Sequence, residues 1–297
     1  MPLKWLEHEG VRHEVKDCLQ PGNPLQEFFP LGYLRSCADE REWTGKPSCT
    51  QLLNGTRQEY LKILCPYADE PGEAAFRVLG SMSHVGLEGE HEDCHNELKI
   101  EVEGITGTLD ALEPLGDGKW RMTDYKTSGS YKVASFLEKG EWTWEFQLNF
   151  YRIGAELLGF DVASMRLFNV VRDGATFIAK KRGIEKQTYY TEIDFIDNEK
   201  VLQYFRGKRD ALLGALKGVE ISLKESSGAR EGIAKEVVLG DAIMQNVPPP
   251  CTPEESWDGR RCKGYCSMKE ECILVGCPYI NEPKKKKSTG DSDLKNF

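Results

Sequence analysis

Three charged residues in the middle of the chain have the types and the spacing that metal-dependent phosphate chemistry requires. Asp110 ends the sequence Gly-Thr-Leu-Asp, and Asp124 and Lys126 follow fourteen and sixteen residues later in Thr-Asp-Tyr-Lys-Thr. Side chains alternate between the two faces of a β-strand, so Asp124 and Lys126 share a face if this segment is a strand. A hairpin would bring Asp110 beside them, which places two carboxylates and an ammonium group on one surface.

This set of groups suits the hydrolysis of a phosphodiester bond. Carboxylate oxygens are good ligands for Mg2+, which keeps several waters that substrate oxygens can replace. A bound metal ion stabilises charge on the phosphate and activates water, and a nearby lysine can orient that water or stabilise developing charge. We therefore assign Asp110 and Asp124 as metal ligands and Lys126 as the residue that serves the attacking water. The alternative is a cross-strand acid–lysine pair on a solvated sheet face.

The surrounding sequence predicts two neighbouring strands that position these groups. The run from residue 100 to 112 is rich in β-branched residues, and Gly107 within it permits close approach of another backbone. Residues 114–119 have turn composition, and a second alternating segment follows from residue 120 to 125. The predicted turn therefore lies between the two acids.

Two further motifs flank this pair of strands. Gly80 to His84 has the sequence Gly-Ser-Met-Ser-His, and Gln147 to Tyr151 has the sequence Gln-Leu-Asn-Phe-Tyr. The order Gly-x-x-x-His, Gly-x-Leu-Asp, Asp-Tyr-Lys-Thr, Gln-x-x-x-Tyr resembles the core of PD-(D/E)XK nucleases. It is most similar to the RecB-like branch, which includes the iron–sulfur nucleases of CRISPR adaptation and of recombinational repair. The resemblance covers about residues 48–216 and, more loosely, the cysteine-rich end.

The resemblance implies a role for each flanking motif. It implies that His84 and the backbone carbonyl of Tyr125 are further metal ligands, and that Gln147 and Tyr151 position DNA. Imidazole favours Mn2+ somewhat more than Mg2+, so either ion is expected. Apart from the resemblance, His84 could be an ordinary core histidine, and Gln147 and Tyr151 could be a pair on a helix surface.

Five of the ten cysteines lie close together near the C-terminus. Their segment is short, polar and rich in turns, so it cannot bury much core of its own and needs a staple. In a reducing compartment a metal centre is favoured over disulfides, with inert thiols as the alternative. The candidate ligands are Cys251, Cys262, Cys266 and Cys272, with Cys277 as a substitute.

The resembling nucleases hold a [4Fe-4S] cluster with Cys-x-x-Cys-x5-Cys and one cysteine far upstream. This chain keeps the gap between Cys266 and Cys272, but three residues separate Cys262 from Cys266. Gly55 stands where the upstream cysteine is expected, so Cys251 is the replacement ligand that we predict. The resemblance implies a [4Fe-4S] cluster, and four thiolates could equally hold a structural Zn2+.

The predicted fold class is α/β, with a mixed central sheet flanked by helices in a restriction-endonuclease-like core. Besides the catalytic strands, we expect helices at 48–64, 74–86, 142–158 and 198–216, and strands at 162–171 and 176–179. The predicted parts are an irregular N-terminal segment at 1–47, the nuclease core at 48–218, a connecting segment at 219–250, a small cysteine-rich metal module at 251–281 and a basic, disordered tail at 282–297.

The composition is that of a globular protein, with 39% hydrophobic residues and a net charge of −9. No apolar run is long enough to span a membrane, and the N-terminus lacks the apolar stretch of a signal peptide, so we expect a cytoplasmic protein in a reducing environment. The negative charge argues weakly against a nonspecific DNA coat protein but is compatible with a local basic groove. Candidate DNA-facing basic residues are Arg57, Lys132, Arg152, Arg172 and 180–182.

Together these features predict a metal-dependent DNA nuclease. An exonuclease of recombination, repair or phage DNA processing fits best, acting on DNA that is single-stranded or has free ends. A protein partner of the helicase, recombinase or integrase type is compatible with this function. The alternatives are a non-cleaving DNA-binding or adaptor subunit with a nuclease fold, and a restriction-type endonuclease.

Overall fold

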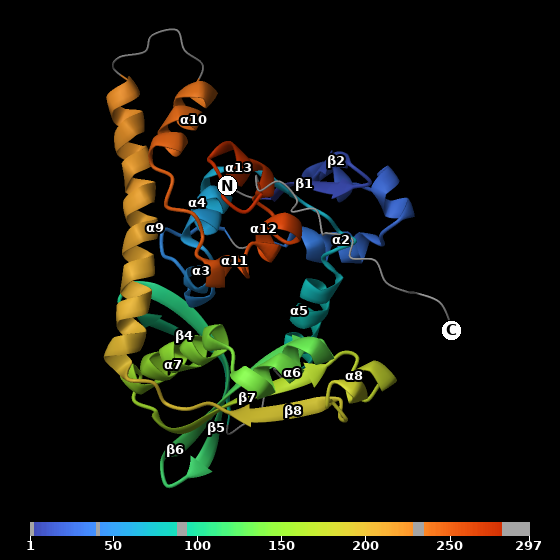
Figure 1. The fold of residues 1–297 in the computed structure, drawn as a ribbon, viewed down its shortest axis with the longest axis vertical. Helices are drawn as coiled ribbons and strands as arrows, with labels where there is room; N and C mark the ends of the chain where they lie inside the picture. Colours follow the sequence, from blue (N-terminus) through green and yellow to red (C-terminus); the bar gives the residue numbers. More distant parts are fainter. Residues whose placement is uncertain (1–2, 40–41, 88–93, 228–234, 281–297) are drawn as a thin grey trace, which may run out of the picture.

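A five-stranded mixed sheet lies in the lower part of Figure 1, in the computed structural model, which describes residues 3–39, 42–87, 94–227 and 235–280. The strand order is β4-β5-β6-β7-β8. The strands are β4 (His95–Val102), β5 (Ile105–Gly116), β6 (Lys119–Ser128), β7 (Asp161–Val171) and β8 (Thr188–Glu192). Strands β6 and β7 are parallel, and the other neighbouring pairs are antiparallel. The predicted mixed sheet flanked by helices is therefore confirmed.

Helices pack on this sheet and carry two of the predicted motifs. Helix α7 (Trp142–Leu157) contacts β4, β5 and β7, helix α5 (Ala75–Leu87) contacts β6, and helix α6 (Ser130–Lys139) contacts β7. Gly154 of α7 faces β4 so closely that a Cβ there would lie 2.8 Å from the Cβ of Ile100. This close approach seats α7 firmly on the sheet.

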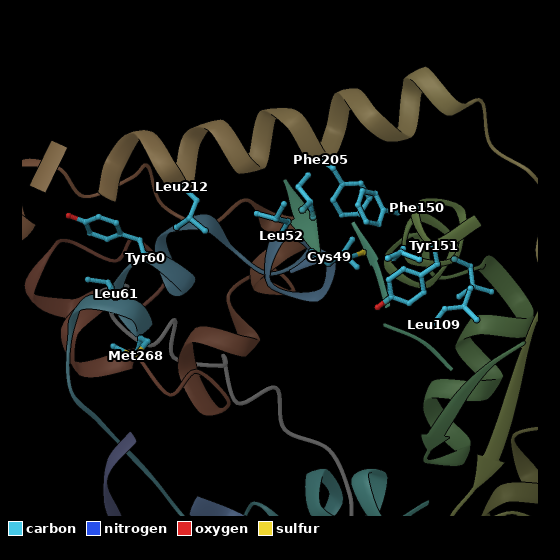
Figure 2. Packing of buried hydrophobic residues seen from close by; sticks show 14 of the residues in the cluster. Cys49, Leu52, Tyr60, Leu61, Leu109, Phe150, Tyr151, Phe205, Leu212 and Met268 are labelled. Carbon is cyan, nitrogen blue, oxygen red and sulfur yellow. The ribbon is translucent and has the colours of Figure 1, made fainter. Parts of the chain in front are cut away.

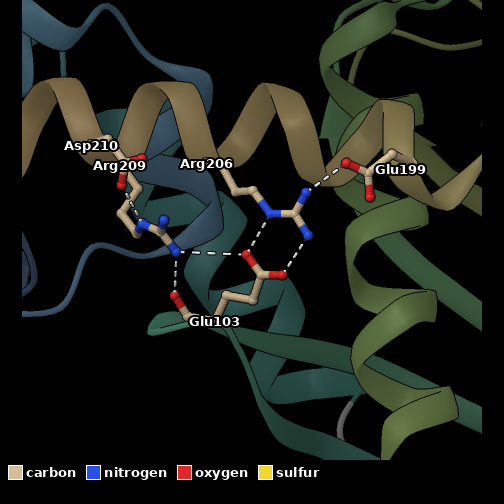
Figure 3. A network of polar contacts seen from close by, with 5 residues as sticks. All are labelled: Glu103, Glu199, Arg206, Arg209 and Asp210. Atoms are coloured by element: carbon tan, nitrogen blue, oxygen red, sulfur yellow. Dashed lines mark hydrogen bonds and ion pairs between the residues drawn. The ribbon is translucent and has the colours of Figure 1, made fainter.

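The long helix α9 (Asn198–Ser227) fixes the hairpin between β4 and β5 (Figure 3). Glu103 and Gly104 both have positive φ, at 52° and 77°, which splits the single strand-like run of the sequence into two strands. Arg206 of α9 forms a bidentate pair with the Glu103 carboxylate at 2.6 and 2.7 Å, and Arg209 donates to the Glu103 carbonyl at 2.7 Å. These contacts lower the pKa of Glu103 and hold the hairpin tip against the helix.

Helix α9 extends beyond the predicted end at residue 216 because its apolar stripe continues. Val219 is buried, and Leu223 packs against the same hydrophobic cluster. The neighbour that covers this extension is helix α10 (Lys235–Gln245), which lies beside α9.

The predicted helix at 48–64 is two helices, α3 (Cys49–Leu53) and α4 (Thr56–Leu64). Ser48 is the N-cap of α3: its Oγ accepts the Gln51 N–H at 3.2 Å, and Gln51 Oε1 accepts the Ser48 N–H at 2.9 Å. The break falls at Gly55, where an added Cβ would overlap Cys251 Sγ. The C-terminal segment thus occupies the space of a side chain at position 55.

The predicted strand at 176–179 is wrong, because Thr176 begins a helix. Its Oγ1 accepts the Ala179 N–H at 3.2 Å and caps α8 (Phe177–Lys181). Phe177 and Ile178 are exposed, so this apolar pair does not belong to the sheet core. The last strand of the sheet, β8, comes later in the chain.

The N-terminal segment is more regular than its prolines indicate. Strands β1 (Leu3–His8) and β2 (Val11–Glu14) form a hairpin, and β3 (Tyr67–Asp69) pairs with β1 in parallel. Glu9 and Gly10 have positive φ, at 50° and 78°, as a two-residue hairpin turn requires. Short helices follow at α1 (Val15–Cys18), η1 (Pro24–Glu27) and α2 (Leu31–Ala38).

One large hydrophobic cluster joins the sheet to the C-terminal segment (Figure 2). Phe150 of α7 and Phe205 of α9 are fully buried, with ring centroids 4.5 Å apart. The cluster continues through Tyr60 of α4 to Met268, so the cysteine-rich segment packs on α4. That segment contains α11 (Pro253–Ser256), α12 (Arg260–Gly264) and α13 (Lys269–Leu274). Among the described residues, no helix is both long and apolar enough to cross a membrane.

Candidate active site

Strands β5 and β6 separate at the two predicted acids. Their paired register runs from the turn as far as Ala111 and Thr123. Beyond this pair, the Tyr125 N–H donates to Oδ2 of Asp110 at 2.7 Å. The Asp110 carboxylate therefore takes the place of a backbone acceptor where the strands part. The residue that donates to it, Tyr125, directly follows Asp124 in the chain.

Asp124 and Lys126 lie on the same face of β6 and contact each other, as strand alternation predicts. Asp124 Oδ2 lies 2.6 Å from Lys126 Nζ, and the Asp124 side chain is only 3% exposed. This contact is an ion pair, and Asp124 Oδ2 makes no hydrogen bond. A buried carboxylate oxygen thus has one charge contact and remaining capacity to bind a cation.

Gln147 and Tyr151 of α7 face the same group of residues. Lys126 Nζ donates to Gln147 Oε1 at 3.2 Å, and Gln147 Nε2 donates to the Tyr151 hydroxyl at 3.0 Å. Because an ammonium group only donates, it fixes which end of the Gln147 amide faces Lys126. The sequence-based alternative of a helix-surface pair is therefore wrong, since both side chains are buried.

Gly107 of β5 makes room for the Tyr151 ring. A Cβ at Gly107 would lie 2.7 Å from Tyr151 Cε1, closer than real side chains approach. The close neighbour of Gly107 is thus an aromatic side chain of α7 and not the backbone that the sequence predicted. Figure 2 shows Tyr151 beside Cys49 and Phe150 in the buried cluster.

Burial raises the pKa of Asp110 to about 7, with a further contribution from the negative charge of Asp124. The ammonium of Lys126 and the Tyr125 N–H act in the opposite direction, and Glu97 adds a weak repulsion. Asp110 therefore holds a proton more readily than an ordinary aspartate when no cation is bound. Hard divalent cations such as Mg2+ and Mn2+ fit two adjacent carboxylates that are short of positive charge.

The further metal ligands that the resemblance implies stay predictions. His84 lies in α5, but its side chain is outside the part of the chain that the structure describes. The carbonyl of Tyr125 belongs to the peptide that follows the one whose N–H donates to Asp110. Among the described residues, no three His, Cys, Asp or Glu side chains form a group that could hold a metal ion.

Sequence reasoning missed Asn169, a polar residue beside Lys126. Asn169 of β7 is the register partner of Lys126 in β6, so the two side chains share a face. It is 0% exposed, and neither Nδ2 nor Oδ1 makes a hydrogen bond. The available signal was the alternation of β7, which places Asn169 on the same face as the buried Met165, Leu167 and Val171.

The predicted basic residues divide into two groups. Arg57 is buried and donates to the carbonyls of Pro248, Val275 and Gly276, and Arg152 is buried against Glu156 and the carbonyl of Ile196. These two arginines make their hydrogen bonds within the fold and are not exposed at the surface. Lys132 is paired with Glu141, which leaves Arg172 and residues 180–182 as the exposed candidates.

The five C-terminal thiols lie near one another. Cys277 is hydrogen-bonded to both Cys262 and Cys272, and burial raises the pKa of each of these two thiols to about 12. Cys251 and Cys266 lie close enough to Cys262 for their charges to raise its pKa. In the same way, Cys266 raises the pKa of Cys251, and Cys277 raises the pKa of Cys266. The ten cysteines, all within the described part of the chain, form no disulfide bond. The thiols thus gather in one place, but their present arrangement is not that of ligands around one ion.

Comparison with known proteins gives one family. A family model described as the PD-(D/E)XK nuclease superfamily matches residues 40–272. A solved structure described as "Crystal structure of SSO0001" is 18% identical, with a TM-score of 0.44, and the match covers 86% of this chain and 97% of that chain. At this similarity the solved structure carries no argument about activity. No curated protein matches the chain.

The raised pKa of Asp110 predicts a pH-dependent effect of Asp110→Asn in metal-free protein. The contribution of Asp110 to the free energy of unfolding of the wild type is largest below the ordinary pKa of 3.8. It is lost as the pH rises through about 7. The Asn variant avoids this loss, so its gain in Tm over wild type should grow between pH 5 and pH 7.5 and then level off. Calorimetry in EDTA measures the gain, and an equal gain at pH 5 and pH 8 would contradict the assignment.

Asn169 and Asn149 form a matched pair for a stability test, because both are completely buried. Asn149 accepts from Ile196 N and donates to the carbonyls of Glu145 and Asp194, whereas Asn169 has no hydrogen bond. We expect Asn169→Leu to raise the free energy of unfolding by about 1–3 kcal/mol and Asn149→Leu to lower it by a similar amount. Urea titration of both variants checks this, and a loss of stability in Asn169→Leu would show that the amide has a partner.

Proposed function

The chain belongs to the PD-(D/E)XK nuclease superfamily, and we propose that it is a Mg2+- or Mn2+-dependent deoxyribonuclease centred on Asp110, Asp124 and Lys126. The observation that carries the proposal is the contact of Asp124 with Lys126 at the point where β5 and β6 separate beside Asp110. Two buried carboxylates next to an ammonium group supply cation ligands and a donor for water in one place.

The described residues of the centre have distinct tasks in this proposal. Asp110 and Asp124 would hold the cation, with His84 and the Tyr125 carbonyl as additional ligands by family resemblance. When bound, the ion neutralises charge on the phosphate and makes water more acidic. Lys126 donates hydrogen bonds and can hold the attacking water at the phosphate.

The position of Lys126 does not depend on Asp124 alone. Gln147 Oε1 accepts from Lys126 Nζ, so the ammonium keeps one fixed partner while the Asp124 carboxylate is used elsewhere. Tyr151 in turn holds Gln147 through its hydroxyl. Asn169, the neighbour of Lys126 on β7, is a further polar group for the amine or its water.

We further propose exonucleolytic cleavage of DNA that is single-stranded or has free ends, in recombination, repair or phage DNA processing. The order of the four motifs and their resemblance to the RecB-like branch support this. A helicase-, recombinase- or integrase-type partner belongs to the same proposal. A non-cleaving adaptor is disfavoured because Asp110, Asp124 and Lys126 are all present and adjacent.

Conservative substitutions test the catalytic centre. Asp124→Asn and Lys126→Gln should each lower Mn2+-dependent DNA degradation by roughly 100-fold or more, the usual effect of losing a positioned catalytic group. Lys119→Gln is the matched control, because Lys119 is an exposed lysine on the same strand. Release of label from 5′- and 3′-labelled single-stranded DNA measures the rate, and circular dichroism verifies folding.

The form of the substrate separates the three candidate functions. Loss of linear but not circular single-stranded DNA indicates an exonuclease, and loss of both indicates an endonuclease. Wild-type protein that degrades neither substrate with Mn2+ or Mg2+ would support the adaptor. Wild-type rates in Lys126→Gln would overturn the catalytic role of the lysine.

We also propose that the C-terminal thiols bind a metal centre, either a [4Fe-4S] cluster or Zn2+. The gathering of Cys251, Cys262, Cys266, Cys272 and Cys277 supports this, as does the placement of Cys251 Sγ against Gly55. Arg57, two residues after Gly55, binds the carbonyls of Val275 and Gly276 and so ties the thiol segment to α4. Thiols with raised pKa values would have to release protons on binding metal.

Metal analysis of anaerobically purified protein tests the thiol centre. We expect bound iron with inorganic sulfide, or zinc, and we expect Cys266→Ser to lose the metal and to lower Tm because metal binding is coupled to folding. Cys94→Ser, in a half-buried cysteine outside the group, is the control. Wild-type protein free of iron and zinc, with unchanged Tm in Cys266→Ser, would contradict the proposal.

A further inference from the structure

Three exposed aromatic rings, each with a cation over it, lie beyond the carboxyl ends of β6 and β7. Arg172 lies 3.6 Å from the ring centroid of Phe76, Lys181 lies 4.4 Å from that of Phe177, and Arg182 lies 5.9 Å from that of Tyr131. The rings are exposed by 62%, 74% and 66%, respectively. We call these six residues the aromatic–basic surface.

The aromatic–basic surface is close to the catalytic lysine along the strand direction. Arg172 donates its backbone N–H to the carbonyl of Ser128 at 2.9 Å, and Ser128 is only two residues beyond Lys126. At about 3.3 Å per residue, Arg172 lies roughly 10 Å beyond the level of Lys126. A polymer bound at the catalytic centre could reach this surface within a few repeating units.

Hydrogen bonds give this surface a fixed base. Asp173 Oδ1 accepts from Ser130 N, Asp173 Oδ2 accepts from Ser130 Oγ, and both distances are 2.6 Å. Arg182 donates to Ser130 Oγ at 2.8 Å, which links the end of α8 to the start of α6. The single acid of residues 172–182 is therefore engaged within the protein, where it also lies 3.8 Å from the Arg182 guanidinium, while Arg172, Lys180 and Lys181 are exposed.

The charge of the surface opposes that of the whole chain. Residues 172–182 contain four basic residues and one acidic residue, whereas the chain has a net charge of −9. Exposed rings and cations together suit an anionic polymer with accessible flat groups. A single DNA strand has this chemistry, because its bases can stack on aromatic rings while its phosphates meet the cations.

We propose that the aromatic–basic surface binds single-stranded DNA next to the catalytic centre, with bases stacked on Phe76, Tyr131 and Phe177. A duplex does not fit this mode, since its bases already stack on each other and do not present their faces. The inference rests on the proposed nuclease function and names the strand state and the path of its substrate.

The test measures binding in EDTA, where metal-dependent cleavage cannot occur. Fluorescence anisotropy of labelled dT20 is followed across a salt series for wild type, Phe177→Ala and Lys181→Ala. Phe177→Ala should raise Kd at least about five-fold, the lower end of the loss of one base stack. Lys181→Ala should reduce the slope of log K against log salt by about 0.7, the value for one phosphate of a single strand.

Phe195→Ala is the matched control for the ring. Phe195 is half exposed and has an arginine over it, Arg152 at 4.7 Å from the ring centroid. It follows the C-terminal end of β8, whereas the aromatic–basic surface lies near the N-terminal end of that strand. Its Kd for dT20 should stay within about two-fold of wild type, since only the aromatic–basic surface is expected to stack bases. Thermal melting verifies that all variants are folded.

The outcomes separate this inference from the nuclease assignment. The inference is overturned if wild type does not bind dT20 or if Phe177→Ala leaves the Kd unchanged. It is also overturned if Phe177→Ala weakens binding to a blunt duplex as much as binding to dT20. Cleavage of dT20 with Mn2+ together with any of these results leaves the nuclease function intact. Weakened binding in Phe177→Ala together with no cleavage by wild type supports the surface and removes the catalytic proposal.

Discussion

A peptide N–H inside a sheet needs an acceptor, and at Tyr125 that acceptor is the Asp110 carboxylate instead of a backbone carbonyl of the neighbouring strand. This substitution lets β5 and β6 part without leaving a buried donor unpaired. The gap holds both acids, and Gly107 on the same strand leaves room for Tyr151. The order of Gly, Asp and Tyr in the motifs is therefore a steric and hydrogen-bonding requirement of one opening in the sheet.

Around this opening, the fold tolerates polar groups that cost stability. Asp110 is buried enough to raise its pKa, Asp124 has an oxygen without a hydrogen bond, and both polar atoms of Asn169 lack partners. Such groups concentrate at functional sites when a large core elsewhere compensates for them. The cluster that runs from α7 through α9 to α4 is that core, and the Arg206–Glu103 pair holds the hairpin that carries β5.

The sequence was most informative where structure depends on near neighbours. Alternation along β6 places Asp124 and Lys126 on one face, and one turn of α7 does the same for Gln147 and Tyr151, so each pair could be predicted from spacing. The contact between the two pairs could not, and only the family resemblance indicated that they share a site. Thr176 was misassigned because a β-branched residue also serves as an N-cap, and local composition does not separate these roles.

Long-range contacts were beyond sequence reasoning. The burial of Arg57 depends on carbonyls about two hundred residues away, and that of Arg152 depends on Ile196 and Asn198. Asn169 needed the register of β6 against β7 before its position beside Lys126 had any meaning.

Gly55 and Cys251 share one volume, because the thiol of one occupies the space of a side chain on the other. The two positions are therefore epistatic: a side chain can be gained at 55 only after the one at 251 has shrunk or moved. During divergence, a cysteine could move from one position to the other only through an intermediate that has room for both side chains, or through one with a cysteine at neither position. The order of such changes is thereby constrained by packing, independently of any selection for activity.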